Sequence, residues 1–286
     1  MGQAALPYFT SNGGYRDRRR RPNRYLLRLQ QLGPGNLEMT GAALPGLAER
    51  RRIAIVPAFN EEGSVATVID EIHSFDPGFE IVVIDDGSSD RTSEVARSRG
   101  VRVVSLPFNL GIGAAMQTGF RFAQVNGFDL AVQIDGDGQH DPAELPAILA
   151  PVLAEEADLV VGSRFSGDGA FRSSFTRRLG IRLFAWTVSA IAGQRLTDTT
   201  SGFRAVNRRG IALFAANYPH DYPEVEATVM VVKHRLRLKE VPVRMRERAA
   251  GRSSITALRS IYYIAKVLLA LFVDLFRREE VPTEDA

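Results

Sequence analysis

Residues 80–90 read EIVVIDDGSSD, a short β-branched run that passes directly into a loop of acidic and small polar residues. Two further stretches have the same form, RIAIVPAFNEE at residues 52–62 and LAVQIDGDGQH at residues 130–140. Short apolar runs bounded by Gly, Pro, Asn or Asp predict buried strands. Each of these three strands is therefore expected to end at a charged loop.

The central part of the chain alternates strand and helix patterns. Strands are predicted at residues 52–57, 80–84, 101–106, 130–134 and 159–161, with helices at about residues 63–75, up to about residue 99, and at 113–126. This alternation indicates an α/β domain with a mainly parallel sheet and helices on both faces. Ligands bind such sheets at the carboxyl ends of the strands. The loops expected to converge there are residues 57–62, 85–90 and 135–139.

Composition limits the class of protein. The chain has 286 residues, of which 45% are hydrophobic and none is cysteine. This size suggests one large domain, alone or with appendages, with enough apolar residues for a substantial core. The lack of cysteine excludes disulfides and cysteine-bound metals and fits a reducing compartment. No apolar stretch precedes the N-terminal arginines, so we expect no secretory signal and a cytoplasmic location.

Three segments differ in composition. Residues 1–50 are rich in Arg, Gly and Pro and predict a disordered tail, with binding to anionic lipid or nucleic acid as the alternative. Residues 51–254 form the predicted folded domain, and residues 255–286 hold an apolar helix at 257–276 and an acidic tail. One face of that helix carries Arg259, Lys266 and Asp274. The pattern predicts an amphipathic helix in a membrane interface, and packing on the domain or in a dimer is the alternative.

The loop Asp135-Gly136-Asp137-Gly138-Gln139-His140 is the sharpest chemical signal. Two carboxylates at alternate positions after a strand can converge on a hard cation, and Gln139 adds an amide oxygen. A solvated turn rich in Asp and Gly is the alternative. A calcium-binding EF-hand loop is a poor fit because its sixth position requires Gly, where this chain has His140.

The loop Asp85–Asp90 has two interpretations. We expect Asp86 to hydrogen-bond a nucleotide base, whereas Asp90 is expected to cap the helix that follows. The nearby Gly111-Ile112-Gly113 is only a weak match to a dinucleotide-binding fingerprint, because the sixth position is Met116. We interpret these glycines as the entry to a closely packed helix.

Several arginines are candidates for binding phosphate, because the planar guanidinium matches two phosphate oxygens. Arg164 ends the fifth predicted strand in Gly162-Ser163-Arg164, and the others are Arg177, Arg178 and Arg248. A single Arg is more often a surface residue. The phosphate-binding hypothesis for Arg164 therefore depends on its position beside Gly and Ser at the end of a strand. The histidines His140 and His234 show no spacing to Ser and Asp that would indicate a nucleophilic triad.

Six motifs in this order closely resemble family 2 glycosyltransferases of GT-A fold. Over residues 52–255 the chain looks like the branch that contains dolichyl-phosphate mannose synthases and polyprenyl-phosphate glycosyltransferases. The motifs are Val56-Pro57-Ala58-Phe59-Asn60-Glu61-Glu62, Asp85-Asp86-Gly87-Ser88, Asn109-Leu110-Gly111, Asp135-Gly136-Asp137-Gly138-Gln139-His140, Gly162-Ser163-Arg164 and Asp198-Thr199-Thr200-Ser201-Gly202-Phe203-Arg204.

The resemblance implies roles for individual residues. The nucleoside would be held by Pro57, Phe59, Glu61 and Asp86. A divalent cation, Mg²⁺ or Mn²⁺, would be bound by Asp137 and Gln139, with Asp135 close by. The phosphates of donor and acceptor would be gripped by Arg164, by Arg178 or Arg177, and by Arg248. Residues that order the site would be Asp198, Arg204 and Glu226.

The same resemblance implies an activity. The expected reaction is inverting transfer of a hexose from a GDP-mannose or UDP-glucose type of donor to a polyprenyl or dolichyl phosphate. The enzyme would lie at the inner face of the membrane, with a separate transmembrane protein as a candidate partner. Alternatives are a glycan or diacylglycerol acceptor, a nucleic-acid-binding protein that uses residues 16–28, and a sugar nucleotidyltransferase. The last class would show a Gly-rich basic loop where this chain has Asn60-Glu61-Glu62.

Overall fold

The computed structural model describes residues 44–164, 185–190, 192–220 and 222–246. All of them belong to one compact unit of the chain. The predicted tail at residues 1–50 lies almost wholly outside these residues, and the predicted amphipathic helix at 257–276 lies wholly outside them. Among the described helices, none combines the length and the apolar character needed to cross a membrane.

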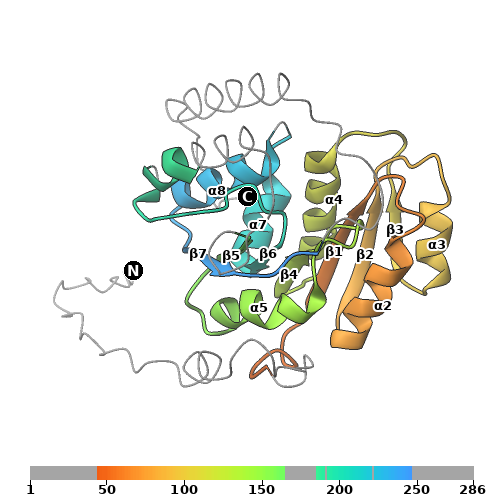
Figure 1. The fold of residues 1–286 in the computed structure, drawn as a ribbon, viewed down its shortest axis with the longest axis horizontal. Helices are drawn as coiled ribbons and strands as arrows, with labels where there is room; N and C mark the ends of the chain where they lie inside the picture. The colour runs from red at the N-terminus through yellow and green to blue at the C-terminus, as the bar shows by residue number, and fades with distance from the viewer. Residues whose placement is uncertain (1–43, 165–184, 191, 221, 247–286) are drawn as a thin grey trace, which may run out of the picture. The chain divides into compact units, whose positions relative to one another are not determined.

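A seven-stranded sheet forms the centre of the described region (Figure 1). Its strands in spatial order are β3 (Arg102–Ser105), β2 (Glu80–Asp85), β1 (Arg52–Ala58), β4 (Leu130–Gln133), β6 (Arg204–Asn207), β5 (Leu159–Ser163) and β7 (Leu238–Pro242). Within this sheet only β6 runs antiparallel to both of its neighbours. Its residue Arg204 pairs with Gln133 of β4 on one side and with Val161 of β5 on the other. The prediction of an α/β domain with a mainly parallel sheet is confirmed.

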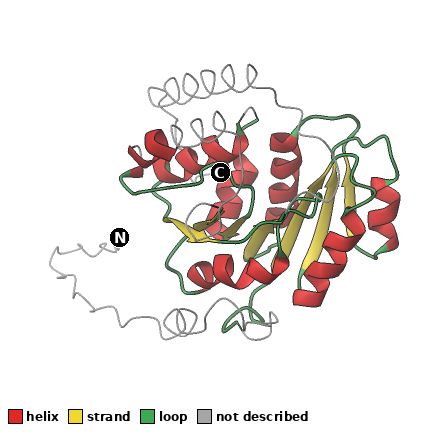
Figure 2. Ribbon diagram, in the orientation of Figure 1, coloured by secondary structure: helices red, strands yellow, loops and turns green. Residues whose placement is uncertain are grey.

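Helices cover the sheet on both sides, as Figure 2 shows. The labelled helices are α2 (Val65–Phe75), α3 (Thr92–Ser98), α4 (Ile112–Val125), the short 3-10 helix η2 (Pro142–Glu144), α5 (Leu145–Leu153), α7 (Arg208–Ala216) and α8 (Pro223–Lys233), and residues 185–190 are also helical. The five predicted strands and the three predicted helices are present within a few residues of the expected bounds. The elements from α5 onward, apart from β5, were not predicted.

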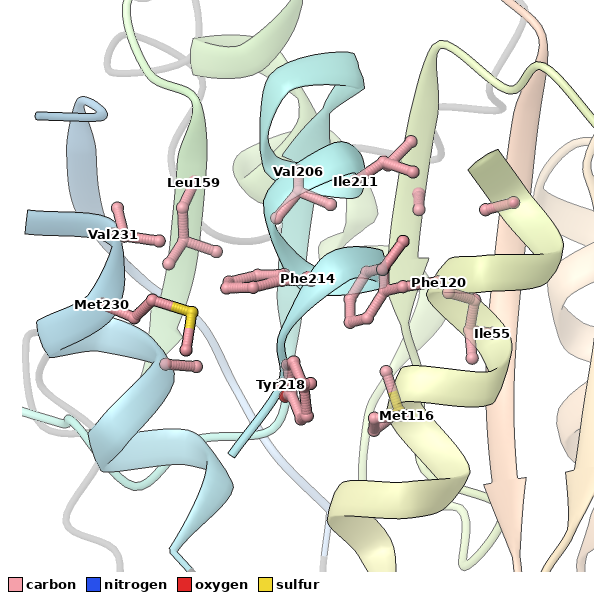
Figure 3. Packing of buried hydrophobic residues seen from close by; sticks show 14 of the residues in the cluster. Ile55, Met116, Phe120, Leu159, Val206, Ile211, Phe214, Tyr218, Met230 and Val231 are labelled. Carbon is pink, nitrogen blue, oxygen red and sulfur yellow. The ribbon is translucent and has the colours of Figure 1, made fainter. Parts of the chain in front are cut away.

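The apolar core between the sheet and helices α4, α7 and α8 holds β1 in place (Figure 3). Ile55 of β1 packs towards Gly119 of α4, where an added Cβ would lie 2.3 Å from the Ile55 side chain. The rings of Phe120, Phe214 and Tyr218 join α4 to α7, with centroids 5.0–5.4 Å apart. Buried aromatic rings of this size contribute a large share of core stabilisation, so this cluster holds α4 and α7 together beside β1.

The glycines before α4 serve its packing. Gly111 is the N-cap at φ +89°, a backbone conformation that residues with a Cβ rarely adopt. A Cβ on Gly113 would lie 2.3 Å from the carbonyl oxygen of Pro219. The interpretation of this motif as a closely packed helix entry is therefore confirmed.

Candidate functional site

The loops after β1, β2 and β4 meet at the rim formed by the carboxyl ends of these strands. The backbone N–H of Asp86 donates to the carbonyl of Ala58 at 2.9 Å, and the N–H of Gly136 donates to the carbonyl of Pro57 at 3.1 Å. The loops that carry Asp86 and Asp137 are thus fastened to consecutive residues of β1. The parallel arrangement of the three strands produces this convergence, because their carboxyl ends face the same way.

The acidic loop after β4 is ordered by its own side chains. Asp137 is buried, and its Oδ1 accepts the backbone N–H of Gln139 at 3.0 Å. Asp135 is partly exposed, and its Oδ1 accepts a hydrogen bond from Nε2 of Gln133 at 3.2 Å. The two carboxylates are therefore held at defined positions beside the end of β1.

His140 supports the acidic loop through a hydrogen bond and a stacked ring. Its buried ring stacks on Phe203 with the centroids 4.9 Å apart, and its Nδ1 accepts the backbone N–H of Asp135 at 3.0 Å. A neutral imidazole that accepts at Nδ1 carries its proton on Nε2. That nitrogen lies 3.6 Å from Oδ2 of Asp135. His140 is accordingly placed to orient Asp135.

The donor atoms of this loop fit a hard divalent cation. Asp135, Asp137 and Gln139 offer oxygen only, which is the ligand type that Mg²⁺ prefers and Mn²⁺ accepts. Gly202 keeps the space beside Asp135 open, because a Cβ there would lie 3.2 Å from Asp135 Oδ2 and 2.9 Å from Gln133 Nε2. Across the described ranges, no group of three or more His, Cys, Asp or Glu side chains is arranged to hold a metal. The predicted set differs from such a group because its third ligand is an amide.

Asp86 orders the loop that leads into α4. Its two carboxylate oxygens accept the backbone N–H groups of Leu110 at 2.8 Å and Gly111 at 2.9 Å. Gly87 stands at φ +70°, and a Cβ there would lie 2.5 Å from the backbone of Phe108. The predicted base-binding residue is thus already bonded to the backbone, with each oxygen retaining capacity for a further hydrogen bond.

The loop after β1 presents one aromatic side chain to solvent. Pro57 is buried within β1, whereas 44% of the surface of Phe59 is exposed. The carboxylate of Glu61 accepts a hydrogen bond from Ser64 at 2.8 Å. Asn60, at φ +57°, accepts the N–H of Ser89 at 2.8 Å and so joins this loop to the loop after β2.

One detail of the loop after β2 corrects the sequence interpretation. The N-cap position of α3 belongs to Arg91, which makes no side-chain cap bond, and not to Asp90. Asp90 instead accepts the N–H groups of Thr92 at 2.9 Å and Glu62 at 3.1 Å. Each N–H group binds a different carboxylate oxygen, so Asp90 serves both the turn and the neighbouring loop.

Arg164 and Asp198, predicted separately, lie together at the end of β5. Nε and Nη2 of Arg164 donate to the two carboxylate oxygens of Asp198 at 2.7 and 2.8 Å, and Nη2 also donates to Thr200. Burial lowers the pKa of Arg164, but the hydrogen bonds and the charge of Asp198 outweigh burial and raise it. The guanidinium is therefore a fixed cation at this rim.

Two residues that support the site were missed from the sequence. Glu240 of β7 accepts the backbone N–H groups of Thr197 at 2.6 Å and Asp198 at 3.0 Å. Arg246 donates its backbone N–H to the carbonyl of Gln139 at 2.9 Å. Each is a single charged residue in a short segment, and no local motif marks it.

The remaining predicted residues fall into three groups. Glu226 lies in the first turn of α8, where its backbone N–H donates to the carbonyl of Tyr222 at 3.0 Å. Arg204 is buried and donates to the carbonyls of Ser201 at 2.8 Å and Thr199 at 3.2 Å, so it orders the loop that carries Asp198. The phosphate-binding candidates Arg177, Arg178 and Arg248 lie outside the described residues.

Comparisons with known proteins agree with these features. A family model described as glycosyl transferase family 2 matches residues 53–213. Polyprenol monophosphomannose synthase of Mycolicibacterium smegmatis is 31% identical over 78% of this chain and 88% of its own length. Undecaprenyl-phosphate mannosyltransferase of Micrococcus luteus is 32% identical over 72% of this chain and 88% of its own length.

A solved structure shares the fold. Glucosyl-3-phosphoglycerate synthase from Mycobacterium tuberculosis, crystallised with Mn²⁺, uridine diphosphate and phosphoglyceric acid, superposes with a TM-score of 0.62. The match covers 84% of this chain and 87% of that chain, at 22% sequence identity. It shows a common α/β architecture of the GT-A-like type.

Proposed function

Since the chain belongs to glycosyl transferase family 2, we propose that it transfers a hexose from a nucleotide-diphosphate sugar to a polyprenyl or dolichyl phosphate. The observation that carries this proposal is that the Asp86 loop and the Asp137 loop are both hydrogen-bonded to the end of β1, at one rim of the sheet. The acceptor class is supported by the names of the two relatives, which are synthases and transferases of polyprenyl-type phosphates.

The nucleotide sugar would lie across the ends of β1, β2 and β4. Phe59 offers an exposed ring for packing against the base, while Glu61 and Asp86 offer carboxylates to its polar edge and ribose. Asp137 and Gln139, with Asp135, would hold Mg²⁺ or Mn²⁺, and the bound cation would offset the negative charge of the departing diphosphate.

Transfer to a phosphate needs no strong general base. A phosphate monoester has a second pKa of about 6, so the acceptor is already anionic at neutral pH. Its oxygen would attack the anomeric carbon and form the new C–O bond. The bond from that carbon to the diphosphate breaks, and the nucleoside diphosphate leaves with the electron pair. A single displacement of this kind inverts the anomeric configuration and passes through an oxocarbenium-like state.

The chain must bring two anions together, and its arginines offset their repulsion. Arg164, fixed by Asp198 at the end of β5, would face the phosphates from one side. Arg178 and Arg248 would complete the grip. Support for Arg248 comes from its place in the sequence, two residues after Arg246, whose backbone is bonded to Gln139.

A lipid acceptor implies a membrane surface. The amphipathic pattern of residues 257–276 would place the enzyme in the interface at the inner face of the membrane, beside its acceptor. Flotation with anionic liposomes tests this: the full chain should float, and a chain that ends at residue 256 should float less. A full chain that stays wholly unbound would contradict the interfacial role.

A donor screen tests the reaction itself. The full chain is incubated with GDP-mannose, UDP-glucose or UDP-N-acetylglucosamine, membrane lipid extract, and Mg²⁺ or Mn²⁺, and glycosylated lipids are identified by mass spectrometry. The expected product is a polyprenyl monophosphate with one hexose. A glycosylated diacylglycerol or glycan, with no sugar-phosphate lipid, would support the alternative acceptor within the same family.

A further inference from the structure

The segment that follows β7 crosses the site from one side to the other. We call residues 243–246 the strap. The N–H of Val243 donates to the carbonyl of Ser163 at 3.0 Å, next to Arg164. His140 and Met245 form an antiparallel bridge, and the N–H of Arg246 donates to Gln139. The strap therefore joins the end of β5 to the loop that carries the proposed cation ligands.

The side chain of Arg246 holds the far end of the strap. Nη1 of Arg246 lies 2.7 and 2.8 Å from the carboxylate oxygens of Glu71 on α2. Its Nε and Nη2 lie 3.2 and 2.8 Å from the carboxylate of Asp141, which precedes η2. Two-point pairing with two carboxylates fixes a planar guanidinium in position and orientation.

We propose that Arg246 is a positioning residue: by pairing with Glu71 and Asp141 it holds the strap against the Asp137–His140 loop and so sets the position of Gln139. This rests on the proposed function, in which Gln139 is a cation ligand. Groups that hold a metal ligand from outside change metal affinity by about 10- to 100-fold when removed. Arg246 would act in this way through the backbone carbonyl of Gln139.

The neighbouring residue on α2 provides a matched control. Asp70 pairs at 3.1 Å with Arg99, the C-cap of α3. The side chains of Arg99 and Arg246 are 44% and 43% exposed, and those of Asp70 and Glu71 are 50% and 31% exposed. Both pairs are exposed ion pairs, each contributing about 0.2–1 kcal/mol to stability. Only the Glu71 pair touches the strap. Arg246 also pairs with Asp141, so Glu71→Gln and Asp70→Asn, each of which breaks one ion pair, are the most closely matched variants.

The experiment compares Arg246→Ala and Glu71→Gln with Arg99→Ala and Asp70→Asn in the full chain. Binding of Mn²⁺ alone is measured by electron paramagnetic resonance of the free ion. We expect Arg246→Ala to weaken Mn²⁺ binding on the order of tenfold, Glu71→Gln to weaken it less, and both controls to match the wild type. Arg246→Lys keeps the charge but not the planar fork, and should restore binding only in part.

Hydrogen exchange gives a readout that involves no metal. Peptides that cover residues 137–141 and 243–246 should exchange faster in Arg246→Ala than in Arg99→Ala, at equal melting temperature. Equal Mn²⁺ affinity and equal exchange in these two variants would overturn the positioning role alone. A wild-type chain that binds no Mn²⁺ would overturn the proposed cation site, and the role of Arg246 would fall with it.

Discussion

Arg164 and Asp198 form a two-point ion pair at the carboxyl end of β5, with both members largely withdrawn from solvent. The backbone N–H of Asp198 is held in turn by Glu240 of β7. β7 therefore determines where the carboxylate of Asp198 lies, and that carboxylate determines where the Arg164 guanidinium lies. A phosphate that approaches this rim meets a cation already oriented.

The pair predicts a non-additive effect on stability. Asp198→Ala leaves a buried guanidinium without its partner, and breaking a buried ion pair in this way costs about 3–5 kcal/mol. The double variant Arg164→Ala with Asp198→Ala removes both charges and should be more stable than Asp198→Ala alone. Urea denaturation of wild type, both single variants and the double variant measures the coupling. Additive losses would contradict a direct contact between the two side chains.

The acidic loop predicts a loss of catalysis without a loss of fold. Asp137→Ala removes a carboxylate from the proposed cation site and should lower kcat by more than about 100-fold, the scale of preorganised electrostatic stabilisation. The melting temperature should stay close to that of Asp70→Asn, a surface control on α2. Transfer is assayed at saturating Mn²⁺. Near-normal turnover there would remove Asp137 from the cation site.

The exposed ring of Phe59 predicts a defect that is confined to the donor. Stacking of a base on an aromatic side chain contributes about 1–3 kcal/mol, so Phe59→Ala should raise the donor KM by about tenfold and leave the acceptor KM unchanged. Val125→Ala is a suitable control, since Val125 is exposed at the far end of α4. Competition by the free nucleoside diphosphate should weaken in parallel. An unchanged donor KM would place the base elsewhere.

The first half of the fold follows from local sequence, whereas the second half does not. β1, β2 and β4 are mainly apolar runs that reach Asn60, Asp85 and Asp135 at or within two residues of their ends, and their bounds match the expected ones closely. β6 is four residues long and contains the buried cation Arg204. Its place in the sheet depends on pairing with Gln133 and Val161, and such long-range pairing leaves no periodic signal.

The candidate site likewise has residues that local motifs predicted and contacts that the sequence did not indicate. Asp86, Asp135 and Asp137 belong to compact motifs at strand ends, and the structure brings their loops to one rim. The pairing of Arg164 with Asp198 joins two motifs that are distant in the chain, so the sequence indicated both residues but not their contact. Glu240 has no motif, because its role arises only when β7 lies beside β5.

A buried carboxylate at the opposite end of β5 gives the last prediction. Asp158 is fully buried and accepts the N–H of Arg237 at 2.8 Å, Nη2 of Arg237 at 3.0 Å and Nδ2 of Asn207 at 2.7 Å. Burial alone would raise the pKa of Asp158, but these hydrogen bonds and the charge of Arg237 outweigh burial and hold it well below the usual value. The carboxylate is therefore ionised in the folded protein under conditions that protonate it in the unfolded chain.

The sign of the pH dependence follows from that lowered pKa. The stabilisation is complete above the unfolded pKa, about 3.9, and is lost as the pH falls towards the folded value. Asp158→Asn should therefore lower the free energy of unfolding by about 1.5–3 kcal/mol at pH 7, a figure kept modest because the Arg237 side chain is 51% exposed. The difference from wild type should shrink below about pH 4.

Glu80→Gln, which removes an exposed pair with Arg51, should change stability little at any pH. Denaturation curves from pH 3 to pH 7 measure both variants, and a difference that stays constant across this range would contradict the lowered pKa.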